Sequence, residues 1–86
     1  MTIDQVVAVA EAALREGLGE TTMNKLRALF PDIHLTYCSD DDVLGVDPIL
    51  RFLRMNVYLV DGRGHCLTLS ESLDDATGLV LAEVHE

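Results

Sequence analysis

The sequence predicts one α+β domain in which two N-terminal helices precede a small, mostly antiparallel sheet of about four strands. Apolar residues recur at helical spacing before Pro31, whereas they alternate with polar residues in later runs. Residues 55–70 contain two alternating runs on either side of the sequence Asp-Gly-Arg-Gly, which is typical of a β-hairpin. Because the chain has 86 residues, we expect a single domain over residues 1–86, with the helices covering one face of the sheet.

The first helix is predicted over residues 3–16. Thr2 and Gln5 form a capping-box pattern, in which each side chain bonds the backbone of the other residue. Apolar residues then recur at helical spacing until Gly17, so this helix should bury one apolar stripe.

A second, shorter helix is predicted to be capped by Thr21 or Thr22 and to end at Pro31. Its apolar face consists of Met23, Leu26, Leu29 and Phe30. A strand over residues 32–38 follows, because apolar and polar residues alternate there and define two faces.

A polar, acid-rich connector occupies residues 39–45. Asp47 and Pro48 then supply the cap and the first-turn residue of a brief helix. That helix would present Ile49, Leu50, Phe52 and Leu53.

The hairpin is predicted to turn through a three-residue loop of Gly62, Arg63 and Gly64, with Gly64 at the positive φ that this loop requires. The register that follows gives two pairs, Val57 with Leu69 and Leu59 with Leu67. The same register places Asp61 beside His65 at the hairpin tip.

Residues 75–78 predict a tight turn with Gly78 in the left-handed conformation, followed by a strand over residues 79–84. The alternative is a helix capped by Ser72, in which Gly78 would be the weak point. We favour the strand. As an exposed edge of a small sheet, it could pair with the same strand of a second copy and form a homodimer.

Charge and cysteine content exclude several classes of function. A formal net charge of −9 repels phosphate backbones and anionic lipid headgroups, so we expect neither a nucleic acid nor a membrane partner. The N-terminal residues contain no basic region and no apolar stretch is long enough to span a membrane, so we expect a cytoplasmic protein. The two cysteines should then be free thiols, and no cofactor is expected.

A metal- or thiol-redox-binding protein that uses His34, Cys38, His65 and Cys66 is one alternative, because zinc and iron sites use these residue types. Geometry opposes it, since His34 and Cys38 lie about 13 Å apart on one strand. His65 and Cys66 are neighbours that point to opposite faces. A site would need His34 or Cys38 together with Cys66, on two strands that lie side by side.

An enzyme built on Asp61 and His65 is another alternative, because a carboxylate can orient an imidazole that acts as a general base. No nucleophile accompanies this pair, and the sequence contains no Gly-x-Ser-x-Gly motif. We therefore assign no catalytic residue.

The leading hypothesis is a small acidic accessory protein that binds another protein. Three consecutive aspartates follow the first predicted strand, and an acidic loop can attract a basic partner. The hairpin tip and the face that bears Tyr58 and Cys66 are expected to be exposed as well. The candidate interface consists of Asp40, Asp41, Asp42, Tyr58, Asp61, Arg63 and His65.

Four segments resemble a family of uncharacterised small bacterial proteins. They are Cys-Ser-Asp-Asp-Asp at 38–42, Tyr-Leu-Val-Asp-Gly-Arg at 58–63, His-Cys-Leu at 65–67 and Ala-Thr-Gly-Leu-Val-Leu-Ala-Glu-Val at 76–84. The resemblance covers most of residues 20–84, and members of the family tend to be encoded among nitrogen-fixation genes. It implies a cytoplasmic accessory protein near iron–sulfur and nitrogenase assembly, and it assigns no catalytic residue.

Overall fold

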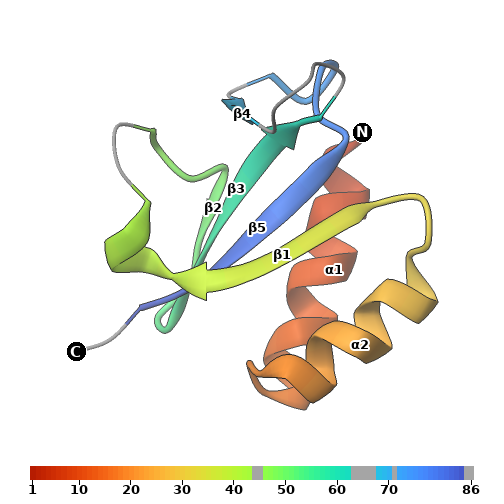
Figure 1. Ribbon diagram of the computed structural model, residues 1–86, viewed down its shortest axis with the longest axis vertical. Coiled ribbons are helices and arrows are strands. Elements are labelled where there is room, and N and C mark those ends of the chain that lie inside the picture. Colours follow the sequence, from red (N-terminus) through yellow and green to blue (C-terminus); the bar gives the residue numbers. More distant parts are fainter. Residues whose placement is uncertain (44–45, 63–67, 71, 85–86) are drawn as a thin grey trace.

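The fold belongs to the α+β class, as predicted (Figure 1). The computed structural model describes residues 1–43, 46–62, 68–70 and 72–84. The elements are the helices α1 (Ile3–Glu16) and α2 (Glu20–Leu29), the 3₁₀ helix η1 (Asp40–Asp42), and the strands β1 (His34–Ser39), β2 (Leu50–Arg51), β3 (Met55–Asp61), β4 (Thr68–Ser70) and β5 (Gly78–Glu83). No helix in the described ranges is long and apolar enough to cross a membrane.

The sheet is mostly antiparallel, also as predicted, and its strand order is β1-β5-β3-β2, with β4 beside β3 (Figure 1). Only β1 and β5 pair in parallel among the described strands. The strand predicted over residues 79–84 is confirmed as β5, and the alternative helix is wrong. Because β5 lies between β1 and β3, it is not an edge, so the predicted pairing of this strand with a second copy is wrong.

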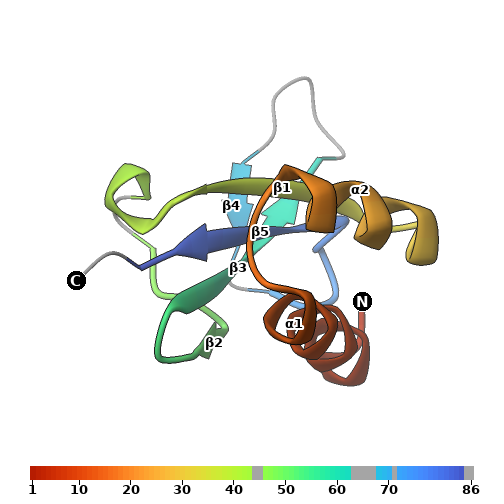
Figure 2. The ribbon, with the colours of Figure 1, turned by 90° about the horizontal axis from the view of Figure 1, so that it is seen from below.

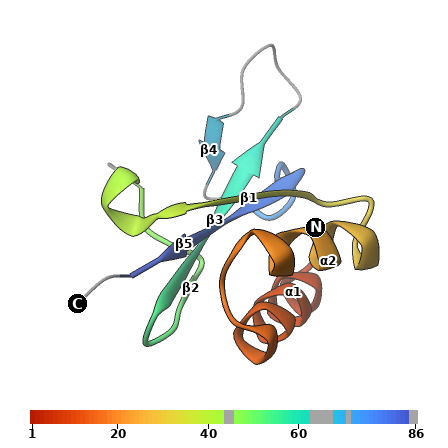
Figure 3. The ribbon, with the colours of Figure 1, turned by 60° about the horizontal axis from the view of Figure 1, so that its bottom comes forward.

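Both helices pack on one side of the sheet, as Figures 2 and 3 show. The core lies between them and the sheet, because α1, α2, β3 and β5 each turn one apolar face inward. Its largest fully buried side chains are Val6, Val9, Met23, Leu26, Met55, Val57, Leu59, Leu79 and Leu81. A second, smaller cluster on the opposite face contains Tyr58, Val60, Val80 and Ala82.

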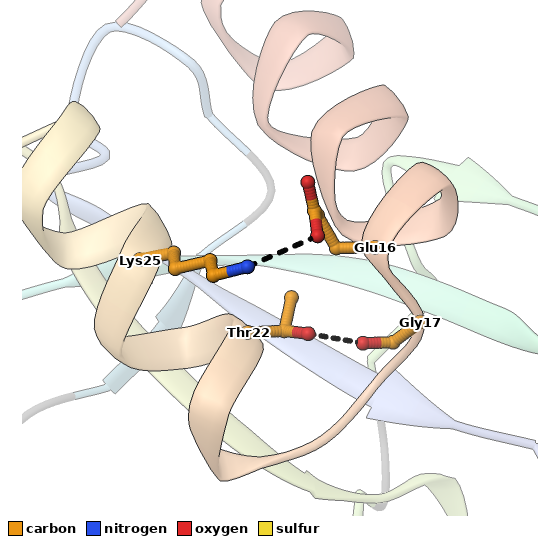
Figure 4. Close-up of polar contacts among 4 residues, drawn as sticks. All are labelled: Glu16, Gly17, Thr22 and Lys25. Carbon is orange, nitrogen blue, oxygen red and sulfur yellow. Dashed lines mark hydrogen bonds and ion pairs between the residues drawn. The ribbon is translucent and has the colours of Figure 1, made fainter.

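The predicted bounds of α1 are confirmed, and so is its capping box between Thr2 and Gln5. The predicted cap of α2 is wrong, because α2 begins at Glu20 with Gly19 as its N-cap residue. Thr22 lies inside the helix and is buried, and its hydroxyl donates to the carbonyl oxygen of Gly17 (Figure 4). Its side chain therefore joins α2 to the end of α1.

An ion pair between Lys25 Nζ and Glu16 Oε2, 3.3 Å apart, spans the same junction (Figure 4). Both side chains are about half exposed, so this pair contributes little to stability. Gly17 ends α1 with a φ of 87°, a conformation that glycine adopts without the strain other residues meet.

The brief helix predicted after Asp47 and Pro48 is wrong, because the chain forms β2 there. Ile49 N–H donates to the Val57 carbonyl at 2.7 Å, and Phe52 N–H donates to the Met55 carbonyl at 2.7 Å. These bonds to β3 satisfy the backbone of a segment too short to gain much from helix formation. Leu53, at the turn between β2 and β3, is 80% exposed rather than part of an apolar helix face.

The hairpin exists, but its predicted register is wrong. The observed pairs are Leu59 with Ser70, Val60 with Leu69, and Asp61 with Thr68. Six residues of the sequence separate Asp61 from Thr68, whereas the predicted loop had three. Leu69 consequently packs with the second cluster, on the face opposite to the one predicted.

Gly78 does not adopt the predicted left-handed conformation, since Gly17 and Gly19 are the only positive-φ residues in the described ranges. Instead, Gly78 opens β5 opposite His34 of β1. A Cβ atom at position 78 would lie 2.2 Å from the His34 carbonyl oxygen. Glycine is needed here because the two backbones approach closely.

Candidate functional site

Asp40, the first residue of the predicted acidic loop, turns towards the sheet. Its Oδ1 accepts hydrogen bonds from Asn56 Nδ2 at 2.9 Å and from the Tyr58 hydroxyl at 2.7 Å. Asp41 is exposed, and the side chain of Asp42 lies outside what the structure describes. Asp40 therefore anchors η1 to β3, whereas Asp41 faces solvent.

Tyr58 lies on a buried face, so the prediction that this face is exposed was wrong. Its side chain is 4% exposed and packs with the second apolar cluster, which Val43, Val46 and Leu69 help to cover. Burial raises the pKa of the Tyr58 phenol above its ordinary value, and the hydrogen bond to Asp40 raises it further. Tyr58 therefore offers a partner almost no surface.

Replacing Asp40 with alanine should remove both hydrogen bonds at once. We expect the free energy of unfolding to fall by about 2 kcal/mol, because a buried tyrosine hydroxyl and the Asn56 amide lose their acceptor. The pKa of Tyr58 should fall but stay above its ordinary value, because burial persists. Urea denaturation and an ultraviolet titration of tyrosinate measure the two effects.

The control for that substitution is Asp41→Ala, which removes a carboxylate from solvent and should change the free energy of unfolding by less than about 0.5 kcal/mol. If Asp40→Ala and Asp41→Ala lowered stability equally, the role assigned to Asp40 would be contradicted.

The raised pKa of Tyr58 also makes stability depend on pH. The folded protein binds the Tyr58 phenol proton more tightly than the unfolded chain does. This difference contributes fully to the free energy of unfolding below pH 10, and the contribution is lost as pH rises through the folded pKa.

The hairpin tip supplies the remaining predicted site residues. Asp61 ends β3 and pairs with Thr68, so the strand register does not place it opposite His65. Arg63, His65 and Cys66 lie outside the described residues.

Two of the four predicted metal ligands lie in the part of the chain that the structure describes. His34 is exposed at the start of β1, and Cys38 is half-buried further along the same strand. Among the described strands, β1 and β4 are not neighbours, because β5 and β3 lie between them. Cys66, which the predicted shared site requires, lies outside the described residues, so this site stays a prediction. Within the described residues, no three His, Cys, Asp or Glu side chains gather as metal ligands would.

A groove of about 670 Å³ lies at β1 and at the residues that lead into this strand. It is lined by Glu20 and Arg27 of α2, by residues 31–37, by Thr77, whose carbonyl accepts from the His34 N–H, and by Gly62, whose N–H donates to the Thr77 hydroxyl. β1 forms the edge of the sheet at this groove, because β5 is its only strand neighbour in the described chain (Figure 1). Residues 34–37 of this edge strand therefore line the groove, whereas Cys38 and Ser39 do not.

Charged groups mark both ends of this groove. Arg27 Nη2 donates to the Leu35 carbonyl oxygen at 3.3 Å, and its Nη1 donates to Asn24 Oδ1 at 3.3 Å. The Tyr37 hydroxyl donates to Glu83 Oε1, and this bond, followed by burial and by the charges of Glu83 and Glu20, raises the pKa of Tyr37. The Tyr37 end is consequently acidic.

Little in the sequence indicates this groove. His34 was singled out only as a metal candidate, and Glu20 and Arg27 were not singled out at all. Whether a strand lies at an edge depends on which strand pairs with it, and alternation of apolar residues does not report that. An arginine within reach of a strand carbonyl is visible only in the folded chain.

Comparison with known proteins gives one family. No curated protein matches this chain, and no solved structure matches it. A family model described as a family of unknown function, DUF6129, matches residues 4–84, which is nearly the whole chain. The chain therefore belongs to the DUF6129 family of unknown function.

Proposed function

We propose that this protein is a small accessory protein that acts by binding another protein, and that the partner occupies the groove along β1. The observation that carries the proposal is the open edge of β1 inside a concave surface. Edge strands present backbone donors and acceptors that natural proteins either protect or use for recognition. Here part of that edge lines the groove, and Arg27 of α2 bonds its Leu35 carbonyl.

The net charge of −9 favours a basic partner, since the field of the whole molecule accelerates association with positive surfaces. The exposed Asp41 adds to this field, and so do acidic residues on α1 and α2. Resemblance to proteins encoded among nitrogen-fixation genes supports a cytoplasmic role close to iron–sulfur or nitrogenase assembly. We place the protein there as a binding component.

Site-specific photo-crosslinking in the native host tests this proposal. Benzoylphenylalanine at His34, which is exposed and lines the groove, should form a covalent adduct with one partner protein. The control position is Glu11, which is exposed on α1 and does not line the groove. An adduct from position 11 but not from position 34, or no adduct from either, would show that the groove is not the binding surface.

A further inference from the structure

We propose that the groove receives an extended peptide segment as an additional strand beside β1, with a lysine or arginine of that segment lying against Glu20. This inference rests on the proposed function and names the chemistry of the partner. Strand addition uses main-chain hydrogen bonds for affinity and alternate side chains for specificity. The backbone and the charges of the groove support each part.

The direction of the β1 backbone groups follows from its ladder with β5. His34 pairs with Gly78 in parallel register, and its N–H donates to the Thr77 carbonyl at 3.2 Å. In a parallel ladder, alternate residues bond the same neighbour. The N–H and C=O groups of Leu35, Tyr37 and Ser39 therefore point away from β5, towards the side on which a strand can add.

Arg27 confirms this direction and limits where pairing can begin. Its guanidinium reaches the Leu35 carbonyl at 3.3 Å from the side opposite to β5. While this contact remains, an incoming strand can pair with Tyr37, which lines the groove, and with Ser39, which follows just beyond the lining residues. Extending the pairing to Leu35 requires Arg27 to release the carbonyl, so Arg27 sets the length of the added ladder.

Charge selects the side chains of the incoming segment. Tyr37 packs towards the helices, so a side chain opposite it on an added strand lies on the same side of the sheet as Glu20. Glu20 lies close enough for its charge to raise the pKa of Tyr37, whereas Asp32, the other carboxylate that lines the groove, precedes β1. A basic side chain complements this surface. A second copy of the protein, itself at −9, is repelled.

Selection from a random peptide library displayed on phage tests the proposal with a defined probe. We expect enriched peptides to carry lysine or arginine and to bind in an extended conformation. In a nitrogen-15 NMR titration, the strongest peptide should shift the amide signals of Leu35, Tyr37 and Ser39 most.

Two substitutions separate the backbone contribution from the charge contribution. Ser39→Pro removes one N–H that points away from β5, and the φ of −81° at this residue suits proline, so the fold should persist. We expect the peptide Kd to rise about fivefold, the effect of one hydrogen bond. Glu20→Gln should raise the Kd about threefold and reduce its salt dependence, whereas the exposed control Glu11→Gln should leave it unchanged.

The results that overturn strand addition differ from those that overturn binding at the groove. Strand addition would be rejected if the selected peptides lacked basic residues, bound as helices, or bound the Ser39→Pro variant unchanged. The proposed function would still stand in that case if position 34 formed an adduct in the host. Failure to enrich any peptide would reject strand addition as well. Absence of an adduct from position 34 would reject both the proposed function and strand addition.

Discussion

Gly78→Ala is expected to lower the free energy of unfolding by about 3 kcal/mol or more, because the added methyl group would clash with the backbone of β1. Its Cβ would lie 2.2 Å from the His34 carbonyl oxygen and 2.7 Å from the His34 Cβ. Backbone atoms cannot rotate aside as a flexible side chain can. Relief requires β1 and β5 to separate where their parallel ladder begins. Urea denaturation measures the loss of stability.

Gly17→Ala is the matched control, because it makes the same chemical change without a clash. No heavy atom lies within 4 Å of a Cβ built at Gly17, although its φ of 87° strains any other residue. We expect a loss of about 1 kcal/mol from that strain alone. If Gly78→Ala cost no more than Gly17→Ala, the close approach of β1 and β5 would not be what requires glycine.

Leu81→Ala is the second substitution with a large expected effect. Leu81 is fully buried at the centre of β5, between Tyr37 of β1 and Val57 of β3. Truncation removes apolar contact and leaves a cavity, so we expect the free energy of unfolding to fall by about 3 kcal/mol. A domain of this size has a total stability of about 4–13 kcal/mol, so this loss is a large share.

Leu53→Ala is its control, since Leu53 is 80% exposed at the turn between β2 and β3. The same change from leucine to alanine should alter stability there by less than about 0.5 kcal/mol. Thermal or urea unfolding of both variants gives the comparison. Similar losses at the two positions would mean that the core does not centre on β5.

The elements predicted with accurate bounds are those whose signals are local. The capping box at Thr2 and the interruption at Gly17 define α1 because each acts within one helical turn. Alternation was enough to identify β1 and β5 as strands. Thr22 misled the prediction of α2, because its hydroxyl bonds the preceding loop at Gly17 rather than the first turn of its own helix.

The predictions that failed depend on contacts between distant segments. The register of β3 and β4 followed from an assumed loop length, and the actual connection is longer. Tyr58 was expected at the surface because the sequence does not show that Val43 and Val46 help to cover its face. The edge position of β1 could not be predicted, because it depends on β5 pairing with one side of β1 and on no other described strand pairing with the opposite side.

The central position of β5 also orders events while the protein is being made. β1 and β3 leave the ribosome before β5, yet they do not pair with each other in the finished sheet. Both must wait for residues 78–83, which insert between them and complete the ladders on each side. Most of the sheet therefore forms in one late step, and the helices that are made first have no complete surface to pack on until that step occurs.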